Sequence, residues 1–312
     1  MKQKTFCIVG FGNHARSKII PAINKINGKI IGIVSSKLSI DSKYAHFSSL
    51  SKAFLKVKSD TIFIICSPPD LHYSQALEII RNEHNLFIEK PVAINLIELN
   101  EIIKLSNKKK TFFVENFMHE YSKFYNNFID FYKLEINNIA KIDIRFTLPK
   151  LPINTFRHKK NNYPVNLYDI GCYTIALITN LSNEAKFSIS KIWNKGQIDC
   201  EKVLVKSKIH NIEIKIIFGI DSSYENSVKV TKIDEYAYIY EPFFYGREGN
   251  RLLQKIIGME IVNKNFYEHD CFETLLEKTE EYWLHSQEER NRIMLNTLSS
   301  LEILAKQYND IE

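Results

Sequence analysis

Short apolar runs alternate with amphipathic stretches across residues 5–132 of the chain. The apolar runs predict strands at Thr5–Val9, Lys29–Val34, Asp60–Cys66, Leu86–Glu89 and Thr111–Glu115. Apolar residues at helical spacing predict helices between and after them, at Ala15–Ile26, Ser48–Leu55, Leu71–Arg81, Leu96–Leu105 and Tyr121–Tyr132. Continuous apolar strands separated by helices are typical of a parallel sheet buried on both faces. The first part of the chain therefore predicts an α/β domain with a doubly wound parallel sheet.

The pattern changes after residue 138, where strands follow one another with few helices between them. These strands are predicted at Lys141–Leu148, Phe187–Trp193, Glu201–Ser207, Glu213–Ile220, Ser227–Thr231 and Tyr236–Tyr240. Helices are predicted at Asp169–Thr179, Phe272–Trp283 and Gln287–Tyr308, the last with Ser286 as its cap. A run of strands after an alternating half indicates a second, mainly antiparallel domain. We therefore expect two domains, residues 1–120 and residues 121–312.

Composition narrows the class of protein. Of the 312 residues 45% are hydrophobic and 25% charged, and the net charge is +6, as expected of a globular protein. The lysines are dispersed, and no basic stripe with interleaved aromatics predicts nucleic-acid binding. The five cysteines lie far apart without metal-ligand spacing, so neither a metal site nor disulfides are predicted. No run is long and apolar enough for a membrane helix, and no signal peptide is recognised, so we expect a cytoplasmic protein.

The segment from Cys7 to Ala15 carries the strongest functional signal, because a short apolar strand runs directly into G-x-G-x-x-A. Gly10 permits the tight turn, Gly12 lets the backbone approach a pyrophosphate, and the small Ala15 lets the next helix pack closely. A helix beginning here favours bound phosphate through its dipole. Gly10, Gly12, Asn13 and His14 are therefore predicted to contact the pyrophosphate of a dinucleotide in a Rossmann domain.

The second predicted strand ends in Ser35, Ser36 and Lys37. An NAD site usually carries an acidic residue at this point, which holds the ribose hydroxyls. Two hydroxyls and an amine suit a 2′-phosphate instead. We therefore predict NADP as the cofactor, with NAD as the alternative.

Two further segments follow predicted strands. The third strand ends in Ser67-Pro68-Pro69-Asp70-Leu71-His72, and the fourth in Glu89-Lys90-Pro91. The carboxyl ends of parallel strands are where ligands bind in open α/β sheets. Ser67, Pro68, His72 and Glu89 are thus predicted to contact the cofactor. For His72 the alternatives are packing near the cofactor or a position at a helix start. Lys90 is predicted to face the ligand crevice.

With these segments the chain resembles the glucose–fructose oxidoreductase and inositol dehydrogenase (Gfo/Idh/MocA) family. The resemblance rests on the glycine motif, the Ser-Pro-Pro segment, Glu89-Lys90-Pro91 and finally Asp169-Ile170-Gly171-Cys172-Tyr173, in the order usual for the family. It implies a Rossmann domain followed by an α+β domain whose open sheet often forms oligomer interfaces. It also implies nicotinamide-dependent hydride transfer on sugars, polyols or related carbonyl compounds.

Carried over residue by residue, the resemblance assigns catalysis to Lys90, Asp169 and Tyr173. The i, i+4 spacing of Asp169 and Tyr173 places both on one face of a helix. A phenol is a reasonable proton donor to a carbonyl oxygen that receives hydride, and a nearby ammonium lowers its pKa. We therefore expect a ketoreductase acting on a sugar or nucleotide-sugar, in which Tyr173 donates the proton and Lys90 polarises the oxygen.

Two other functions remain open. The residues before Asp169, from Asn161 to Tyr168, lack the glycines of many relatives, so a cofactor-binding sensor or assembly protein without catalysis is one alternative. Oxidation of a diol or aldose is the other. Arg157, His158 and Lys160 precede this segment and are interpreted either as contacts for an anionic substrate group or as solvated surface. A small-molecule substrate and a homodimer or homotetramer are the expected partners.

Overall fold

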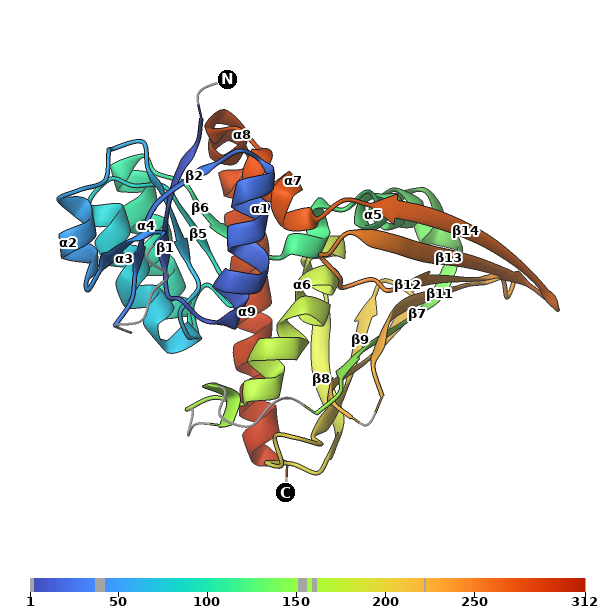
Figure 1. Cartoon of the computed structure of the whole chain (residues 1–312). Helices are drawn as coiled ribbons and strands as arrows, with labels where there is room; N and C mark the ends of the chain where they lie inside the picture. Colours follow the sequence, from blue (N-terminus) through green and yellow to red (C-terminus); the bar gives the residue numbers. More distant parts are fainter. Residues whose placement is uncertain (1–2, 37–42, 151–155, 159–161, 222, 312) are drawn as a thin grey trace. The chain divides into compact units, whose positions relative to one another are not determined.

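The computed structural model describes residues 3–36, 43–150, 156–158, 162–221 and 223–311 (Figure 1). The chain divides into two compact units. The first contains residues 1–117 and 272–292, and the second contains residues 118–271 and 293–312. The helices at residues 272–292 thus return to the first unit, whereas the sequence analysis placed everything after residue 120 in the second domain.

The first unit is built on a six-stranded parallel sheet in the order β3-β2-β1-β4-β5-β6. Its strands are β1 (Thr5–Val9), β2 (Lys29–Val34), β3 (Ala45–Phe47), β4 (Ile62–Ile65), β5 (Leu86–Ile88) and β6 (Phe113–Glu115). Strands β4 and β5 are almost wholly buried, as continuous apolar strands covered on both faces must be. This arrangement confirms the predicted doubly wound sheet.

Helices connect these strands (Figure 1). They are η1 (Ala15–Ile19), α1 (Ile20–Lys25), α2 (Leu50–Phe54), η2 (Pro69–Leu71), α3 (His72–Arg81) and α4 (Leu96–Lys109). The side chains of Ser49 and Asn95 cap α2 and α4 by accepting hydrogen bonds from backbone N–H groups of the first turn. Trp283 of α8 (Glu280–His285) packs edge-on against Phe87 of β5, which anchors the returning helices to this sheet.

The second unit contains an eight-stranded sheet in the order β14-β13-β12-β11-β7-β10-β9-β8. Its strands are β7 (Ile139–Leu148), β8 (Lys186–Trp193), β9 (Lys202–Ile209), β10 (Ile212–Ile220), β11 (Glu225–Lys232), β12 (Ala237–Glu241), β13 (Gly249–Ile257) and β14 (Glu260–Glu268). Only β7 and β10 pair in parallel; the other neighbours are antiparallel. The predicted mainly antiparallel sheet is confirmed.

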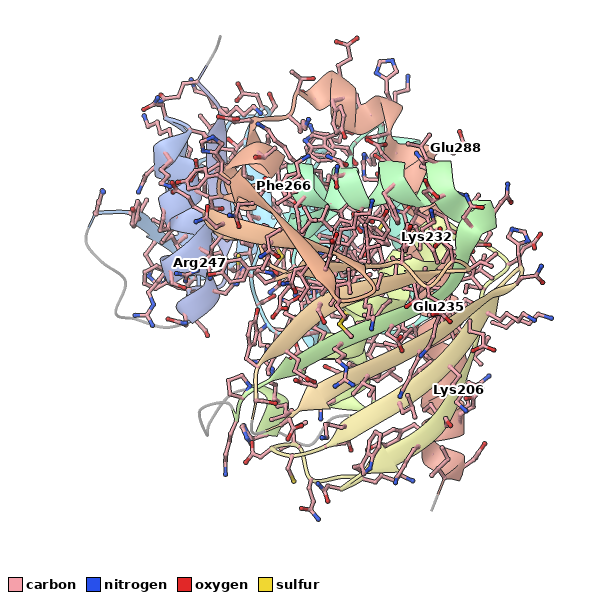
Figure 2. The ribbon with its side chains drawn as sticks, turned by 90° about the vertical axis from the view of Figure 1, so that its right-hand side faces the viewer. Lys206, Lys232, Glu235, Arg247, Phe266 and Glu288 are labelled. Carbon is pink, nitrogen blue, oxygen red and sulfur yellow. The ribbon has the colours of Figure 1, made fainter. Side chains whose placement is uncertain are left out.

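One face of this sheet carries the core of the second unit. Phe124 and Phe128 of α5 (Lys123–Glu135) pack against Tyr240 of β12. A buried hydroxyl pair, Thr179 of α6 (Cys172–Leu181) and Thr297 of α9 (Gln287–Asp310), joins two of the helices at 2.7 Å. The opposite face is polar and open, and Figure 2 looks onto it, with Lys206 of β9 projecting from it. Short 3₁₀ turns η3 (Met118–Tyr121), η4 (Ile136–Asn138) and η5 (Phe156–His158) complete the connections.

Several predicted elements differ from the structure. The strands β3, β13 and β14 were not predicted, and the single helix expected at Phe272–Trp283 is two helices, α7 (Cys271–Glu277) and α8. Ser286, the expected cap of the last helix, is the C-cap residue of α8, and its hydroxyl donates to the Tyr282 carbonyl of that helix at 2.8 Å. Across the described stretches of the chain, no helix combines the length and apolar character needed to cross a membrane.

Candidate active site

The glycine turn after β1 has the geometry that a dinucleotide needs. Gly10 has φ +94°, and a Cβ there would lie 2.9 Å from the backbone nitrogen of Ser67, so only glycine fits between β1 and the turn after β4. Gly12 is different, since a Cβ there would meet nothing within 4 Å. The helical segment begins directly behind it, with the Arg16 N–H donating to the Gly12 carbonyl at 3.2 Å. Open space in front of a glycine at a helix start fits a pyrophosphate.

Two helices of the structure begin with a segment of π-helix. Both η1, which follows the glycine turn, and η6 (Leu167–Gly171), which carries Asp169, are π-helical in the described part of the chain. Such segments are rare and occur often at functional sites. They coincide here with the two helix starts to which sequence reasoning assigned function, and those assignments stay predictions.

The segment after β2 lies at the end of the strand as predicted. The Ser35 carbonyl lies 2.7 Å from Nε2 of His46, and the Ser35 N–H donates to Phe47 at 3.0 Å. Ser36 is exposed. Lys37 lies outside the described residues. The contact of these residues with an adenosine phosphate therefore stays a prediction.

The segment after β4 forms a supported loop. The Ser67 hydroxyl donates to Oε1 of Gln75 at 2.6 Å. His72 is fully buried, with Nδ1 2.8 Å from the Pro91 carbonyl and Nε2 2.9 Å from the Ser67 carbonyl. Burial lowers the pKa of His72, against the opposing effect of these carbonyls. With no exposed ring surface, His72 joins the loop after β4 to the Glu-Lys-Pro turn, and it is the first residue of α3, which is the helix-start alternative. Its contact with a cofactor stays a prediction.

Glu89 and His14 are brought together at the carboxyl edge of the same sheet. Nε2 of His14 lies 2.8 Å from Oε1 of Glu89, and Nδ2 of Asn116 donates to the same oxygen at 3.0 Å. Burial opposes ionisation of Glu89, but His14, Asn116 and the Lys90 charge together outweigh it and hold the pKa of Glu89 below its usual value. The glycine motif and the Glu-Lys-Pro turn thus share one hydrogen-bonded cluster.

Sequence reasoning assigned no function to Glu115, the last residue of β6. Its Oε1 accepts a hydrogen bond from the Val92 N–H at 2.9 Å, just after the Glu-Lys-Pro turn. Burial, together with the nearby Glu89 charge and against the Val92 hydrogen bond and Lys90, raises the pKa of Glu115 to about 7. Its position at a strand end next to Glu89 was the available signal, because neighbouring parallel strands end at one edge.

In the second unit Tyr173 lies on the first turn of α6, within an aromatic cluster. Its ring centroid is 5.4 Å from those of His119 and Phe146, and its hydroxyl donates to Sδ of Met118 at 3.7 Å. Burial lowers the pKa of His119 to about 3, so this neighbour is a neutral imidazole. A thioether is a weak acceptor. A substrate oxygen is a stronger one, so the phenol is suited to redirect its hydrogen bond.

Asp169 is largely buried and binds Arg157 through two contacts. Nη2 of Arg157 donates to Oδ1 at 3.1 Å, and Nε donates to Oδ2. The adjacent His158 places Nε2 2.9 Å from Oδ1 of Asp199. Arg157 and His158 are thus engaged with carboxylates rather than wholly solvated, and Lys160 lies outside the described residues. Asp169 and Tyr173 belong to the second unit and Lys90 to the first, so the meeting of all three stays a prediction.

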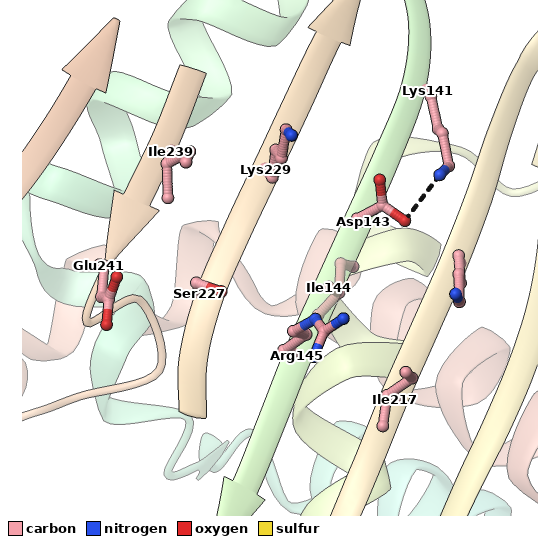
Figure 3. Close-up of a pocket in the computed structure, with 10 residues that line it drawn as sticks. Lys141, Asp143, Ile144, Arg145, Ile217, Ser227, Lys229, Ile239 and Glu241 are labelled. Atoms are coloured by element: carbon pink, nitrogen blue, oxygen red, sulfur yellow. Dashed lines mark ion pairs between the residues drawn. The ribbon is translucent and has the colours of Figure 1, made fainter. Parts of the chain in front are cut away.

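A cavity of about 430 Å³ lies elsewhere, on the open face of the second unit's sheet. Its lining is charged and aliphatic, including Asp143, Arg145 and Lys229 (Figure 3). Lys141 pairs with Asp143 there at 3.0 Å. None of the residues predicted to bind cofactor or to catalyse lines this cavity.

Comparison with known proteins bears on the first unit directly. Residues 4–117 match the GFO_IDH_MocA family, described as an oxidoreductase family with an NAD-binding Rossmann fold. Over these residues the chain is similar to this family. The match covers β1 to β6 and includes the glycine turn and the Glu-Lys-Pro turn, and it confirms the predicted nicotinamide dinucleotide cofactor.

Two curated relatives are trans-1,2-dihydrobenzene-1,2-diol dehydrogenases. The protein from Xenopus tropicalis is 23% identical over 175 residues, which cover 53% of this chain and 51% of that protein. The protein from Xenopus laevis is 24% identical over 178 residues, covering 54% and 52%. The chain therefore spans about half the length of the curated relatives it matches.

Solved structures extend the likeness of fold to the whole chain. KijD10, a 3-ketoreductase from Actinomadura kijaniata in complex with NADP and TDP-benzene, superposes with a TM-score of 0.81 at 13% identity and covers 98% of both chains. Aldose-aldose oxidoreductase from Caulobacter crescentus, complexed with glycerol, gives a TM-score of 0.82 at 13% identity and covers 99% of this chain and 98% of that one. These likenesses establish a shared fold for both units.

Proposed function

We propose that this chain is an NADP(H)-dependent oxidoreductase that reduces a ketone on a sugar or nucleotide-linked sugar. The observation that carries the proposal is the cluster at the carboxyl edge of the first sheet. There a glycine turn with open space at Gly12 lies beside the bonded pair His14 and Glu89, and Lys90 follows directly. A cofactor-binding edge with a lysine at its mouth suits hydride transfer to a carbonyl group.

The bound cofactor supplies the hydride. Lys90 polarises the carbonyl oxygen and stabilises the negative charge that develops on it. Tyr173 donates its phenolic proton to that oxygen, which completes the alcohol, and solvent returns a proton to the phenolate. Asp169, held by Arg157, orients the substrate. His119 beside Tyr173 is a neutral imidazole, so Lys90 supplies the positive charge of this mechanism.

Preference for NADP is supported by the residues after β2, which include Ser35 and Ser36 and no carboxylate up to Lys37. The solved structure of KijD10 holds NADP, which agrees with this preference without deciding it for the present chain. Lys37→Ala is expected to weaken NADPH binding more than NADH binding, as measured by fluorescence titration. Equal losses would remove the 2′-phosphate assignment.

The experiment that tests the function follows NADPH absorbance with a panel of keto-sugars and nucleotide-linked keto-sugars. Tyr173→Phe is expected to reduce kcat by roughly 10² to 10⁴, the usual contribution of general acid catalysis, with unchanged cofactor affinity. Tyr168→Phe is the matched control, because Tyr168 is a buried tyrosine of the adjoining turn and is expected to retain kcat. Equal kcat for wild type and Tyr173→Phe would exclude the phenol from the reaction.

A second candidate is oxidation of a diol, favoured by the name of the two curated relatives. The same residues serve the reverse direction, in which the Tyr173 phenolate accepts the hydroxyl proton. Turnover of trans-diols with NADP⁺, together with no turnover of keto-sugars, would select this candidate. Cofactor binding without turnover in either direction would favour the sensor alternative.

A further inference from the structure

The carboxyl edge of the first sheet carries two carboxylic acids, at the ends of the neighbouring strands β5 and β6. In the parallel pairing of β5 and β6, Ile88 is the partner of Glu115, and Glu89 follows Ile88. Both side chains therefore leave neighbouring strands at the same edge. This is the edge outside which ligands bind in open α/β sheets.

The two acids have different surroundings. Glu89 receives two side-chain donors on one oxygen, from His14 at 2.8 Å and Asn116 at 3.0 Å. Glu115 receives one backbone donor, the Val92 N–H at 2.9 Å. Pairs of acids whose environments separate their pKa values divide into an ionised member and a proton-holding member. By this criterion Glu89 is the ionised member and Glu115 holds the proton.

The charges that face Glu115 support this division. The turn after β5 contributes both Glu89, whose negative charge opposes ionisation of Glu115, and Lys90, whose charge favours it. His14 contacts Glu89 directly, with its Nε2 atom 2.8 Å from Oε1 of Glu89. Burial is the largest effect on Glu115 and places its pKa at about 7, so it changes charge within the physiological range.

We propose that Glu115 is a protonation switch at the cofactor edge: neutral Glu115 favours the reduced cofactor, and ionised Glu115 favours the oxidised one. The physical reason is charge, because the oxidised nicotinamide ring is cationic and the reduced ring is neutral. A carboxylate that appears in a partly desolvated site stabilises the cation selectively. The inference rests on the proposed function, since it requires a nicotinamide at this edge.

Dissociation constants of NADPH and NADP⁺, with NADH and NAD⁺ in parallel, test the switch between pH 6 and pH 8. The measured quantity is the Kd of the oxidised cofactor divided by the Kd of the reduced cofactor. In the wild type we expect this ratio to fall by roughly three- to tenfold as pH rises, which is the effect of one partly screened charge. Glu115→Gln keeps an acceptor for the Val92 N–H but cannot ionise, so its ratio should not change with pH. Glu98→Gln is the matched control, since Glu98 also accepts from a backbone N–H, that of Ile94, and its ratio should follow the wild type. The same slope in Glu115→Gln and wild type would overturn the proposal.

A second pair of measurements separates this proposal from the proposed function. If no dinucleotide binds, the proposed function fails, and urea unfolding of the free protein still tests Glu115. A proton held by the folded state makes the wild type lose stability relative to Glu115→Gln as pH rises from about 4.5 to about 7. A stability difference that is constant with pH would overturn the inference. Should Glu115→Gln fail to fold, Glu89→Gln replaces it: removal of the neighbouring charge must move the pH transition of the Kd ratio downward, and an unmoved transition contradicts the switch.

Discussion

Asp169 shows how burial decides the role of a single charged side chain. Its carboxylate is only 7% exposed and Arg157 is 23% exposed, so the pair is screened weakly by water. A buried charge that loses its partner costs far more than a surface charge that does the same. Arg157 therefore contributes to folding as well as to the position of Asp169.

Replacement of Arg157 by alanine is expected to destabilise the protein by roughly 1–3 kcal/mol, less than the loss of a fully buried pair because Arg157 keeps some exposure. Urea unfolding at pH 7 measures the change. Arg145→Ala is the control, because Arg145 pairs with Glu225 on the exposed sheet face and should cost less than about 1 kcal/mol. Equal losses in both variants would mean that burial of Asp169 does not govern this pair.

His119 makes a second prediction at this scale, concerning pH. Burial lowers its pKa to about 3 in the folded protein, whereas the unfolded chain binds the proton near 6.5. The unfolded state therefore holds more protons between these values, and stability falls as pH drops below about 6.5, by up to ~1.4 kcal/mol per pH unit. His119→Phe keeps a ring in the aromatic cluster and removes the titration. Its unfolding free energy should decline less between pH 6.5 and 5, and an identical decline would exclude His119 as the cause.

At the scale of elements, close approach decides where the helix bearing Tyr173 can lie. A Cβ on Gly171, the last residue of η6, would lie 2.8 Å from the ring of Phe218 on β10. The backbone of Gly171 is thus in direct contact with the ring of Phe218. Because Gly171 directly precedes α6, this contact fixes where α6 begins. The position of Tyr173 depends on this contact.

Gly171→Ala is expected to destabilise the second unit by roughly 1–3 kcal/mol through overpacking. Thermal unfolding measures the loss. The double variant Gly171→Ala with Phe218→Leu tests the cause, because a smaller side chain makes room for the new methyl group and should recover part of the stability. Strict additivity of the two losses would argue against the contact.

Strands and helices could be predicted from the sequence where their burial leaves a clear apolar pattern. β1 and β2 have the predicted bounds, because both are apolar runs inside a covered sheet. β14 was missed because seven of its residues are exposed or nearly so on both faces, which removes the alternation that marks a strand. The break between α7 and α8 was also missed, since Thr279 caps α8 within a stretch that keeps helical spacing.

For the molecule as a whole, the open face of the second sheet is the feature to explain, since among the described residues of its unit the helices pack on the other face (Figure 2). It includes aliphatic side chains such as Ile217 and Ile239 among its charges. Exposed apolar side chains that cluster on one face mark interaction sites, and most soluble oligomers are symmetric homo-oligomers. We propose that the expected homodimer or homotetramer forms through this face.

Light scattering after size exclusion is expected to give the mass of a dimer or tetramer. The double variant Ile217→Glu with Ile239→Glu should lower the mass by adding charge to that face. Leu55→Glu is the control, since Leu55 is 81% exposed on the first unit and its replacement should leave the mass unchanged. A monomeric wild type would contradict the predicted assembly.

The sequence alone determined the parallel sheet, the mainly antiparallel sheet after it and the position of the dinucleotide motif. Those features depend on local periodicity and on Gly10, which no other residue can replace at the turn after β1. Only the tertiary structure decided that Glu89 bonds His14, that Arg157 binds Asp169, that His119 lies against Tyr173 and that Glu115 lies beside Glu89. These partners are distant in sequence, and their burial and charge, which set their pKa values, exist only once the strands and helices have packed.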